Sequence, residues 1–303
     1  MEGKKTFIVL ISVYLIVTCL FFSIAWADPV TVFVSILPQK YFVQQIGKDR
    51  VNIQIMVLPG ASPATYEPKP SQMTALTSAK IYFSIGVPFE NVWLKKIAAT
   101  NPGMRIVPTD HDIDKLSMGH RHAHHAPDGK HDRLTNDSVH PNFQDPHIWT
   151  SPPLVMFQAR TILTALQAAD PTHRDFYETN YKHFLENIAD LDAQIRKLLY
   201  NYRGKAFIAF HPSWGYYAHT YGLKQIAIEI EGKEPKPSQL QSLIHQAKSE
   251  NIRVVFVQPQ FSSKTARLIA KSIDGEVIQA DPLAEAWASN LLNQTRQFVK
   301  AFH

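Results

Sequence analysis

Short apolar runs alternate with segments of helical periodicity along most of the chain. The runs in the first half predict strands at residues 31–36, 51–58, 81–85 and 105–107. The second half repeats the order, with strands predicted at residues 206–210, 225–228, 254–257 and 276–278. Helical patterns separate the strands, at residues 38–46 and 89–99 in the first half. Because strands separated by helices pair in parallel, we expect an α/β protein of two lobes, each with a mostly parallel sheet.

A long amphipathic stripe lies between the two halves. Its apolar members recur at alternating spacings of four and three, and they are Tyr177, Tyr181, Phe184, Ile188, Leu191, Ile195, Leu198 and Tyr202. Asp170 can cap this helix, Pro171 suits its first turn and Gly204 can end it. At 1.5 Å per residue, residues 171–203 would span roughly 50 Å, which is longer than one small lobe. We expect a rigid helix along both lobes; a coiled-coil dimer seam is the alternative.

The first 27 residues have the pattern of a secretory signal peptide. Lys4 and Lys5 precede an apolar stretch, and Ala25-Trp26-Ala27 fits the small-x-small cleavage pattern. An uncleaved membrane anchor is the alternative, because the stretch is long enough to span a bilayer. Ile16-Val17-Thr18 before Cys19 lacks the small residue expected ahead of a lipidated cysteine. The predicted domains are then a first lobe at residues 28–170, a linking helix at 171–203 and a second lobe at 204–303.

Composition limits the chemistry available to the exported chain. Of 303 residues one is cysteine and fourteen are histidine, and the formal net charge is +5. The cysteine lies in the predicted leader, so any metal must bind through nitrogen and oxygen atoms. A chain of this length buries a large core without a structural metal, and a metal site would therefore be functional. The basic excess is mild and forms no stripe interleaved with aromatic residues, which argues against nucleic-acid binding.

Residues 110–146 are rich in histidine and poor in large apolar side chains. We expect a mobile loop here, because such a segment cannot bury enough surface to order itself. His120, His122, His124 and His125 are candidates for low-affinity zinc capture ahead of a main site. A solvated loop with incidental metal affinity is the alternative. In either case these imidazoles lose metal affinity as pH falls through their pKa near 6.5.

Three further residues stand where a metal site is expected. His211 directly follows the predicted strand 206–210, Asp281 follows the run that contains strand 276–278, and His147 lies where the histidine-rich segment meets the next helix. Ligands of open α/β sheets bind outside the carboxyl ends of the strands. Two imidazoles and one carboxylate suit zinc. The chain has no Gly-x-Gly-x-x-Gly, phosphate-loop, His-Glu-x-x-His or Cys-x-x-Cys motif that would indicate other chemistry.

An ordered set of short motifs resembles the metal-binding, periplasmic solute-binding proteins of zinc and manganese ABC transporters. The matching stretches are Pro59-Gly60-Ala61-Ser62-Pro63, Tyr66-Glu67-Pro68-Lys69-Pro70, Asp145-Pro146-His147-Ile148-Trp149, the run His211 to Gly215, and Asp281-Pro282-Leu283. The resemblance covers nearly the whole chain after the leader. It implies two Rossmann-like α/β lobes joined by one long rigid helix, with one metal ion in the cleft between them.

The resemblance also assigns ligands. His147 matches the family's second metal ligand, His211 the third and Asp281 the fourth. Members with a manganese preference tend to have glutamate at the third place, so His211 favours zinc. A histidine-rich loop is likewise typical of the zinc branch. The usual first histidine is replaced by Ala64. Water or a loop histidine such as His122 or His124 is expected to fill its place, and Tyr66 or Glu67 is the alternative.

These observations predict an extracytoplasmic, monomeric zinc-binding protein that delivers its ion to a membrane ABC permease. The long helix should limit hinge opening, so we expect local loop movement rather than wide closure. A zinc-dependent hydrolase is an alternative from another class, since three protein ligands and an open position are typical of catalytic zinc. A manganese or iron binder of the same family is the other alternative.

Overall fold

The computed structural model describes residues 28–118, 144–229 and 232–302. The predicted signal peptide and the histidines from His120 to His140 lie outside the described residues. Within those three ranges, none of the helices combines the length and the apolar character that crossing a membrane requires.

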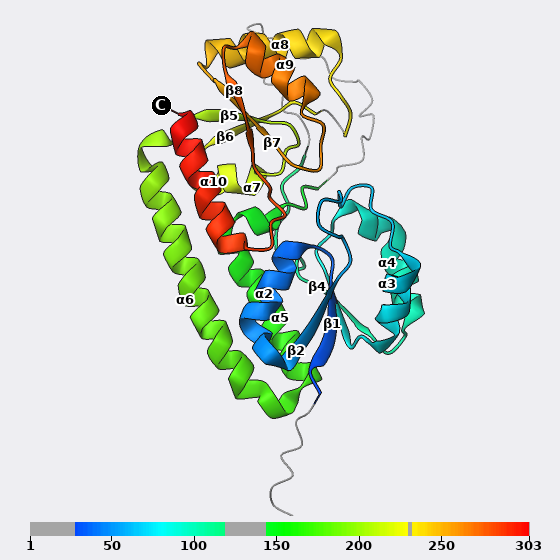
Figure 1. The fold of residues 1–303 in the computed structure, drawn as a ribbon. Helices are drawn as coiled ribbons and strands as arrows, with labels where there is room; N and C mark the ends of the chain where they lie inside the picture. The colour runs from blue at the N-terminus through cyan, green and yellow to red at the C-terminus, as the bar shows by residue number, and fades with distance from the viewer. Residues whose placement is uncertain (1–27, 119–143, 230–231, 303) are drawn as a thin grey trace, which may run out of the picture.

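The lower lobe in Figure 1 is built on a four-stranded parallel sheet with the strand order β2-β1-β3-β4. The strands are β1 (Val30–Val34), β2 (Val51–Ile55), β3 (Ile81–Ser84) and β4 (Arg105–Pro108). Helices α2 (Leu37–Gly47) and α5 (Pro152–Ala169) pack on one face, and α3 (Pro70–Ala75) and α4 (Pro88–Thr100) lie on the other (Figure 1). The inner strands β1 and β3 consist almost entirely of buried residues, because a parallel sheet is covered on both faces.

The predicted strand at residues 51–58 is longer than the observed one. β2 ends at Ile55, although hydrogen bonding to the neighbouring chain segment continues. The backbone N–H of Met56 donates to the Val34 carbonyl and that of Val57 to the Ser35 carbonyl, at 2.9 Å each. The apolar run therefore extends beyond the regular strand because both residues enter the core as the chain turns.

The upper lobe repeats the architecture with a parallel sheet in the order β6-β5-β7-β8. Its strands are β5 (Ala206–Ala209), β6 (Lys224–Ala227), β7 (Val254–Val257) and β8 (Glu276–Gln279). Helices α8 (Pro237–Ser249) and α9 (Lys264–Ser272) cover the outer face, while α7 (Gly215–Tyr221) and α10 (Trp287–Ala301) lie toward the rest of the molecule (Figure 1). Because side chains alternate along a strand, Phe207 joins the main core and Ile208 joins a separate core under α8 and α9.

Helix α6 (Arg174–Leu199) runs along both lobes as the sequence predicts (Figure 1). Its 26 residues span about 39 Å. The 3₁₀ turns η4 (Pro171–His173) and η5 (Tyr200–Tyr202) adjoin α6 at its two ends, so the helical segment extends over nearly all of the predicted residues 171–203. Asp170 does not cap the backbone there: its carboxylate accepts hydrogen bonds from the Tyr177 hydroxyl and from Nδ1 of His173, both at 2.8 Å.

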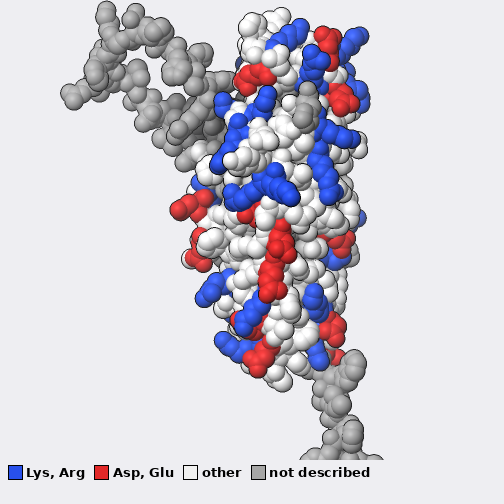
Figure 2. Space-filling view, turned by 90° about the vertical axis from the view of Figure 1, so that its left-hand side faces the viewer, with Lys and Arg blue, Asp and Glu red and all other residues white. Residues whose placement is uncertain are grey.

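The apolar stripe of α6 faces its own molecule. Tyr177, Phe184, Ile188, Leu191 and Ile195 are all buried, and α6 packs against α2, α5 and α10. Figure 2 views the α6 side of the molecule: Lys and Arg are most numerous over the upper half, and Asp and Glu are scattered from top to bottom. A coiled-coil dimer seam is therefore contradicted, because the stripe that would form it is already covered.

A second connection joins the lobes beside α6. The indole nitrogen of Trp149 donates to the Pro282 carbonyl at 2.8 Å, and that of Trp287 donates to the Trp149 carbonyl at 2.7 Å. Trp287 also packs edge-on against Phe42 of α2, with 5.0 Å between ring centroids. One hydrophobic core consequently runs through both lobes. The remaining 3₁₀ turns are η1 (Lys48–Arg50), η2 (Leu76–Ser78) and η3 (Ile148–Thr150).

Candidate metal centre

A cavity of about 500 Å³ lies between the lobes, at the carboxyl ends of both sheets. Gly86 borders it just after β3 of the lower lobe, and His211 and Gln258 border it just after β5 and β7 of the upper lobe. The two central strands are β1 and β3 in the lower sheet and β5 and β7 in the upper sheet. Between them the order of the strands reverses, because the chain adds strands first on one side of the sheet and then on the other. Ligands of open α/β sheets bind at such switch points, and here the two switch points face one another.

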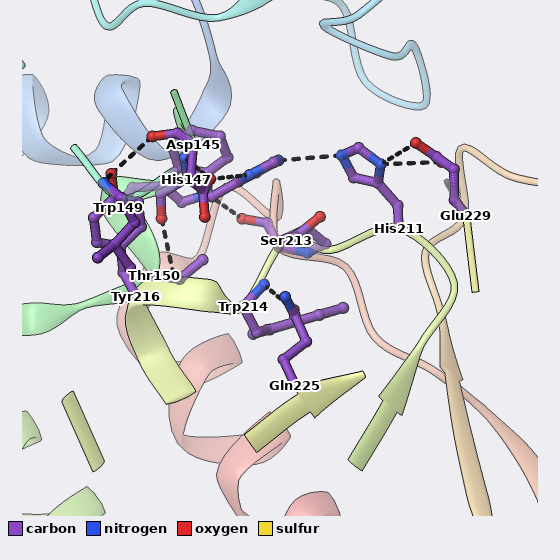
Figure 3. A network of polar contacts seen from close by, with 12 residues as sticks. Asp145, His147, Trp149, Thr150, His211, Ser213, Trp214, Tyr216, Gln225 and Glu229 are labelled. Atoms are coloured by element: carbon purple, nitrogen blue, oxygen red, sulfur yellow. Dashed lines mark hydrogen bonds and ion pairs between the residues drawn. The ribbon is translucent and has the colours of Figure 1, made fainter. Parts of the chain in front are cut away.

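Two imidazoles meet in this cavity. His147, from the segment just before η3, and His211, from the loop after β5, place their Nε2 atoms 3.3 Å apart (Figure 3). In a tetrahedral site with zinc–nitrogen bonds of 2.0–2.1 Å, two imidazole nitrogens lie about 3.3 Å apart. The separation therefore fits two ligands of a single zinc ion.

Each imidazole has a carboxylate behind it. Nδ1 of His147 lies 2.6 Å from Oδ1 of Asp145, and Nδ1 of His211 lies 3.1 Å from both oxygens of Glu229 (Figure 3). A carboxylate only accepts, so both Nδ1 atoms carry a proton, and in the neutral imidazoles both Nε2 atoms present lone pairs to each other. Facing lone pairs repel, and a cation between them replaces the repulsion with two coordinate bonds.

Local hydrogen bonds hold His147 and its carboxylate in place. Oδ1 of Asp145 also accepts the backbone N–H of His147 at 2.9 Å, and the Tyr216 hydroxyl donates to the Asp145 carbonyl at 2.8 Å. The side chain of Thr150 donates to the His147 carbonyl at 2.9 Å. The loop that carries His147 is therefore fixed from the upper lobe, through Tyr216 of α7, as well as from within.

His211 is held by the two neighbouring strands. Gln258 accepts the backbone N–H of His211 at 3.2 Å and donates to its carbonyl at 2.6 Å. Glu229 lies beside His211 because Ala209 of β5 pairs with Ala227 of β6 in parallel register, and each polar residue follows two positions later. Phe261 stacks on the imidazole with 5.0 Å between ring centroids.

Burial controls the charge of this histidine. Desolvation lowers the pKa of His211, although the hydrogen bond to Glu229 opposes that shift. A lowered pKa keeps the imidazole neutral near pH 7, which leaves Nε2 free to coordinate a cation.

Asp281 lies apart from the paired imidazoles. It borders a smaller neighbouring cavity, where its Oδ1 accepts hydrogen bonds from Nε2 of Gln260 at 3.1 Å and from the backbone N–H of Leu283 at 2.9 Å. Gln260 and Leu283 border both cavities. Among the described residues, no group of three or more histidine, cysteine, aspartate or glutamate side chains is arranged to hold a metal ion.

Ala64 borders the main cavity from the lower lobe, so the departure from the family pattern lies at the cleft itself. Neither Tyr66 nor Glu67 is among the residues that line this cavity, and the Tyr66 hydroxyl donates to Gln72 at 2.7 Å. The candidate capture residues His120, His122, His124 and His125 lie outside the described residues.

Sequence reasoning missed Asp145, Glu229 and Gln258. Asp145 stands two positions before His147, within the same stretch Asp145-Pro146-His147-Ile148-Trp149 that indicates His147 as a ligand. Glu229 and Gln258 each follow a predicted strand, as His211 does, so the rule that located His211 applies to them as well. Which polar strand-end residues meet depends on sheet order and register, which the sequence does not specify.

Two α/β lobes with donors from both sides of one cleft form the architecture of a solute-binding protein. The family model described as zinc-uptake complex component A, periplasmic (ZnuA), matches residues 32–301. The chain therefore belongs to this family, and the resemblance inferred from the short motifs is confirmed.

Individual relatives agree with the family match. The high-affinity zinc uptake system protein ZnuA of Bacillus subtilis is 28% identical over 250 residues, which cover 81% of this chain and 76% of the relative. A crystal structure of ZnuA is 39% identical, with a TM-score of 0.82, and the match covers 91% of this chain and 100% of that one. A zinc-bound ZnuA lacking residues 138–173 is similar at 39% identity and a TM-score of 0.81, over 90% and 98% of the two chains. These structures confirm the predicted fold class.

Proposed function

We propose that this protein captures Zn²⁺ between its lobes and delivers it to a membrane ABC permease outside the cytoplasm. One observation carries the proposal: two carboxylate-backed imidazoles present their Nε2 atoms to each other at the spacing of zinc ligands. The names of the relatives, which describe zinc uptake, support the same cargo. We infer that the protein acts as a monomeric carrier and that its predicted leader is cleaved.

The proposed ligands are His147, His211 and Asp281. The imidazoles are already together, whereas Asp281 lies in the neighbouring cavity, where its Oδ1 accepts hydrogen bonds from Gln260 and Leu283. Gln260 and Leu283 border both cavities, and we infer that a local movement of the loops that carry them brings Asp281 to the ion. Release to the permease follows the same route in reverse, through loops at the cleft rim.

Zinc titration of histidine variants tests the main site. We expect His147→Ala and His211→Ala each to lose stoichiometric high-affinity binding in calorimetry, because one remaining imidazole cannot hold the ion tightly. His219→Ala is the matched control, since His219 is an exposed residue of α7 outside the cavity. Undiminished affinity in both cleft variants would refute the assigned site.

The histidine-rich segment has a separate proposed role in low-affinity capture. A full-length variant with His120, His122, His124 and His125 replaced by asparagine should lose additional weak zinc sites and keep the tight one. If the weak sites persist, the capture role is wrong and the cleft assignment is unaffected.

A further inference from the structure

The cleft is much larger than a metal ion needs. Its volume of about 500 Å³ is that of a pocket for a small organic molecule. A water molecule, by comparison, occupies about 30 Å³ in the liquid. The space that a zinc ion leaves next to His147 and His211 is therefore sufficient for a second, non-protein component.

Among the described residues, the cleft is also short of donor atoms. Two imidazole nitrogens supply half of a tetrahedral shell, and Asp281 is held in the neighbouring cavity by Gln260 and Leu283. Ala64 brings only a methyl group to the lower-lobe wall. Even with Asp281 bound to the ion, one position stays open; without it, two positions do.

The charges near the cleft favour a co-ligand of low net charge. Asp145 and Glu229 together balance the two positive charges of one zinc ion. On the lower-lobe wall Lys115 and Asp110 form a largely buried ion pair, with 12% and 16% of their side chains exposed, so this wall is neutral. A highly charged anion would find no uncompensated positive group there, because Lys115 is the only lysine or arginine among the described lining residues and Asp110 already neutralises it.

The remaining walls combine apolar and polar surface. Phe261 and Leu283 offer apolar contacts, and Ser62, Ser213 and Gln260 offer hydrogen-bonding groups. This mixture suits a molecule with both a hydrocarbon or ring portion and polar donor atoms.

We infer that the cleft takes zinc together with a small amino-acid chelator, which coordinates the ion through its amine nitrogen and carboxylate oxygen. Nitrogen and oxygen donors match the preference of zinc, and one bidentate molecule fills the two positions that the imidazoles leave. With Asp281 also bound, the bidentate chelator makes the ion five-coordinate, a coordination number that zinc can adopt. The inference rests on the proposed function and specifies the form in which the cargo arrives.

Retention of a labelled chelator tests the inference. The full-length protein is incubated with zinc alone, with ¹³C-labelled L-histidine alone, and with both, then desalted and analysed for metal and for the label. We expect one labelled histidine per protein only when zinc is present. Imidazole with acetate at the same concentration should not be retained, because separate donors lack the chelate advantage. Zinc retained one-to-one without the label overturns the inference and leaves the proposed function standing; no zinc in any sample overturns both.

A gain-of-donor variant gives a second, independent readout. Ala64→His adds an imidazole at the cleft wall, so we expect zinc affinity without chelator to rise at least about tenfold and label retention to fall by a similar factor. Ala64 is exposed on a loop, so the change does not disturb the core. Ala99→His, on exposed surface of α4, is the control and should change neither quantity. Unchanged label retention in Ala64→His overturns the inference.

The histidine-rich segment is a competing source of donors within the chain. We expect the variant with His120, His122, His124 and His125 replaced by asparagine to retain the labelled histidine as the native protein does. Loss of label retention in that variant would instead assign the open positions to the chain's own histidines.

Discussion

Position decides what a histidine–carboxylate pair does in this protein. His111 and Asp112 form such a pair at 2.9 Å, but about three quarters of each side chain is exposed to solvent. His147 and Asp145 form the same pair at 2.6 Å with less than a tenth exposed. Water screens the first pair, so its contribution is small. The second is desolvated, and its carboxylate fixes which nitrogen of the imidazole faces the cleft.

Replacing the buried carboxylate should weaken metal binding without unfolding the protein. We expect Asp145→Asn to lower zinc affinity about 10- to 100-fold, because the amide is a poorer acceptor for the Nδ1 proton of His147. Competition titration against a chromophoric chelator measures this. Asp112→Asn is the matched control and should bind zinc as the native protein does; equal affinities in the two variants would contradict the role of Asp145.

A second buried carboxylate makes stability depend on pH. Glu90 of α4 is 4% exposed, and desolvation raises its pKa from 4.5 to about 7, against the effect of hydrogen bonds from Ser35, Gly86 and Ile85. The folded state therefore holds the proton more tightly than the unfolded state. This stabilisation is complete below pH 4.5 and is lost as pH rises to about 7.

Glu90→Gln tests this linkage. Denaturant unfolding of the native protein and the variant is compared between pH 4.5 and 8. Relative to the variant, we expect the native protein to lose up to about 3 kcal/mol of unfolding free energy over that range, because only the carboxyl group titrates. A pH-independent difference between the two proteins would mean that the pKa of Glu90 is not raised.

Among the helices, α6 and α10 determine how the lobes are joined. The stripe of α6 is buried against helices of both lobes, and α10 returns from the end of the chain to pack beside it (Figure 1). Trp287, the first residue of α10, contacts Phe42 in the lower lobe and donates to the Trp149 carbonyl. The lobes therefore share one core and should unfold as one unit.

Truncation in the middle of the α6 stripe should destabilise the whole molecule. We expect Ile188→Ala, at a residue 1% exposed, to lower the unfolding free energy by about 2–5 kcal/mol while calorimetry still shows one transition. Val92→Ala, at a residue 64% exposed on α4, should cost less than about 0.5 kcal/mol. Two resolved transitions in Ile188→Ala would contradict the shared core.

The molecule as a whole combines a shared core with an open cleft. The two sheets face each other with the same strand order, so their carboxyl ends meet across the cavity. Away from the cavity, α6, α10 and the tryptophan contacts connect the lobes. A wide hinge motion would break that core, whereas movement of the rim loops would not.

Zinc should accordingly change the distance between the lobes very little. Spin labels at Lys96 on α4 and Lys248 on α8, both exposed, report this distance. We expect their mean separation to shift by less than about 2 Å on adding zinc. Trp287→Phe, which removes the donor to Trp149, should broaden the distance distribution. A shift of several ångströms in the native protein would show hinge closure.

Sequence patterns alone establish the fold class, the linking helix and the two histidines of the cleft. Apolar periodicity reports which faces of an element are buried, because burial acts on each segment locally. The rule that ligands bind at strand ends indicates His211, and the place of His147 between the histidine-rich segment and the next helix indicates His147, which the family motif also matches. Neither could show that the two Nε2 atoms lie 3.3 Å apart, since the residues are 64 positions apart in the chain.

The remainder of the site depends on how the segments pack. Glu229 backs His211 only because β5 and β6 pair in one register, and a single-residue shift would turn its side chain to the other face. Asp281 follows a strand as predicted, yet Gln260 and Leu283 hold it in the neighbouring cavity. Local patterns record which residues are buried and where strands end, whereas the coordination of a metal ion depends on distances that exist only once the lobes have assembled.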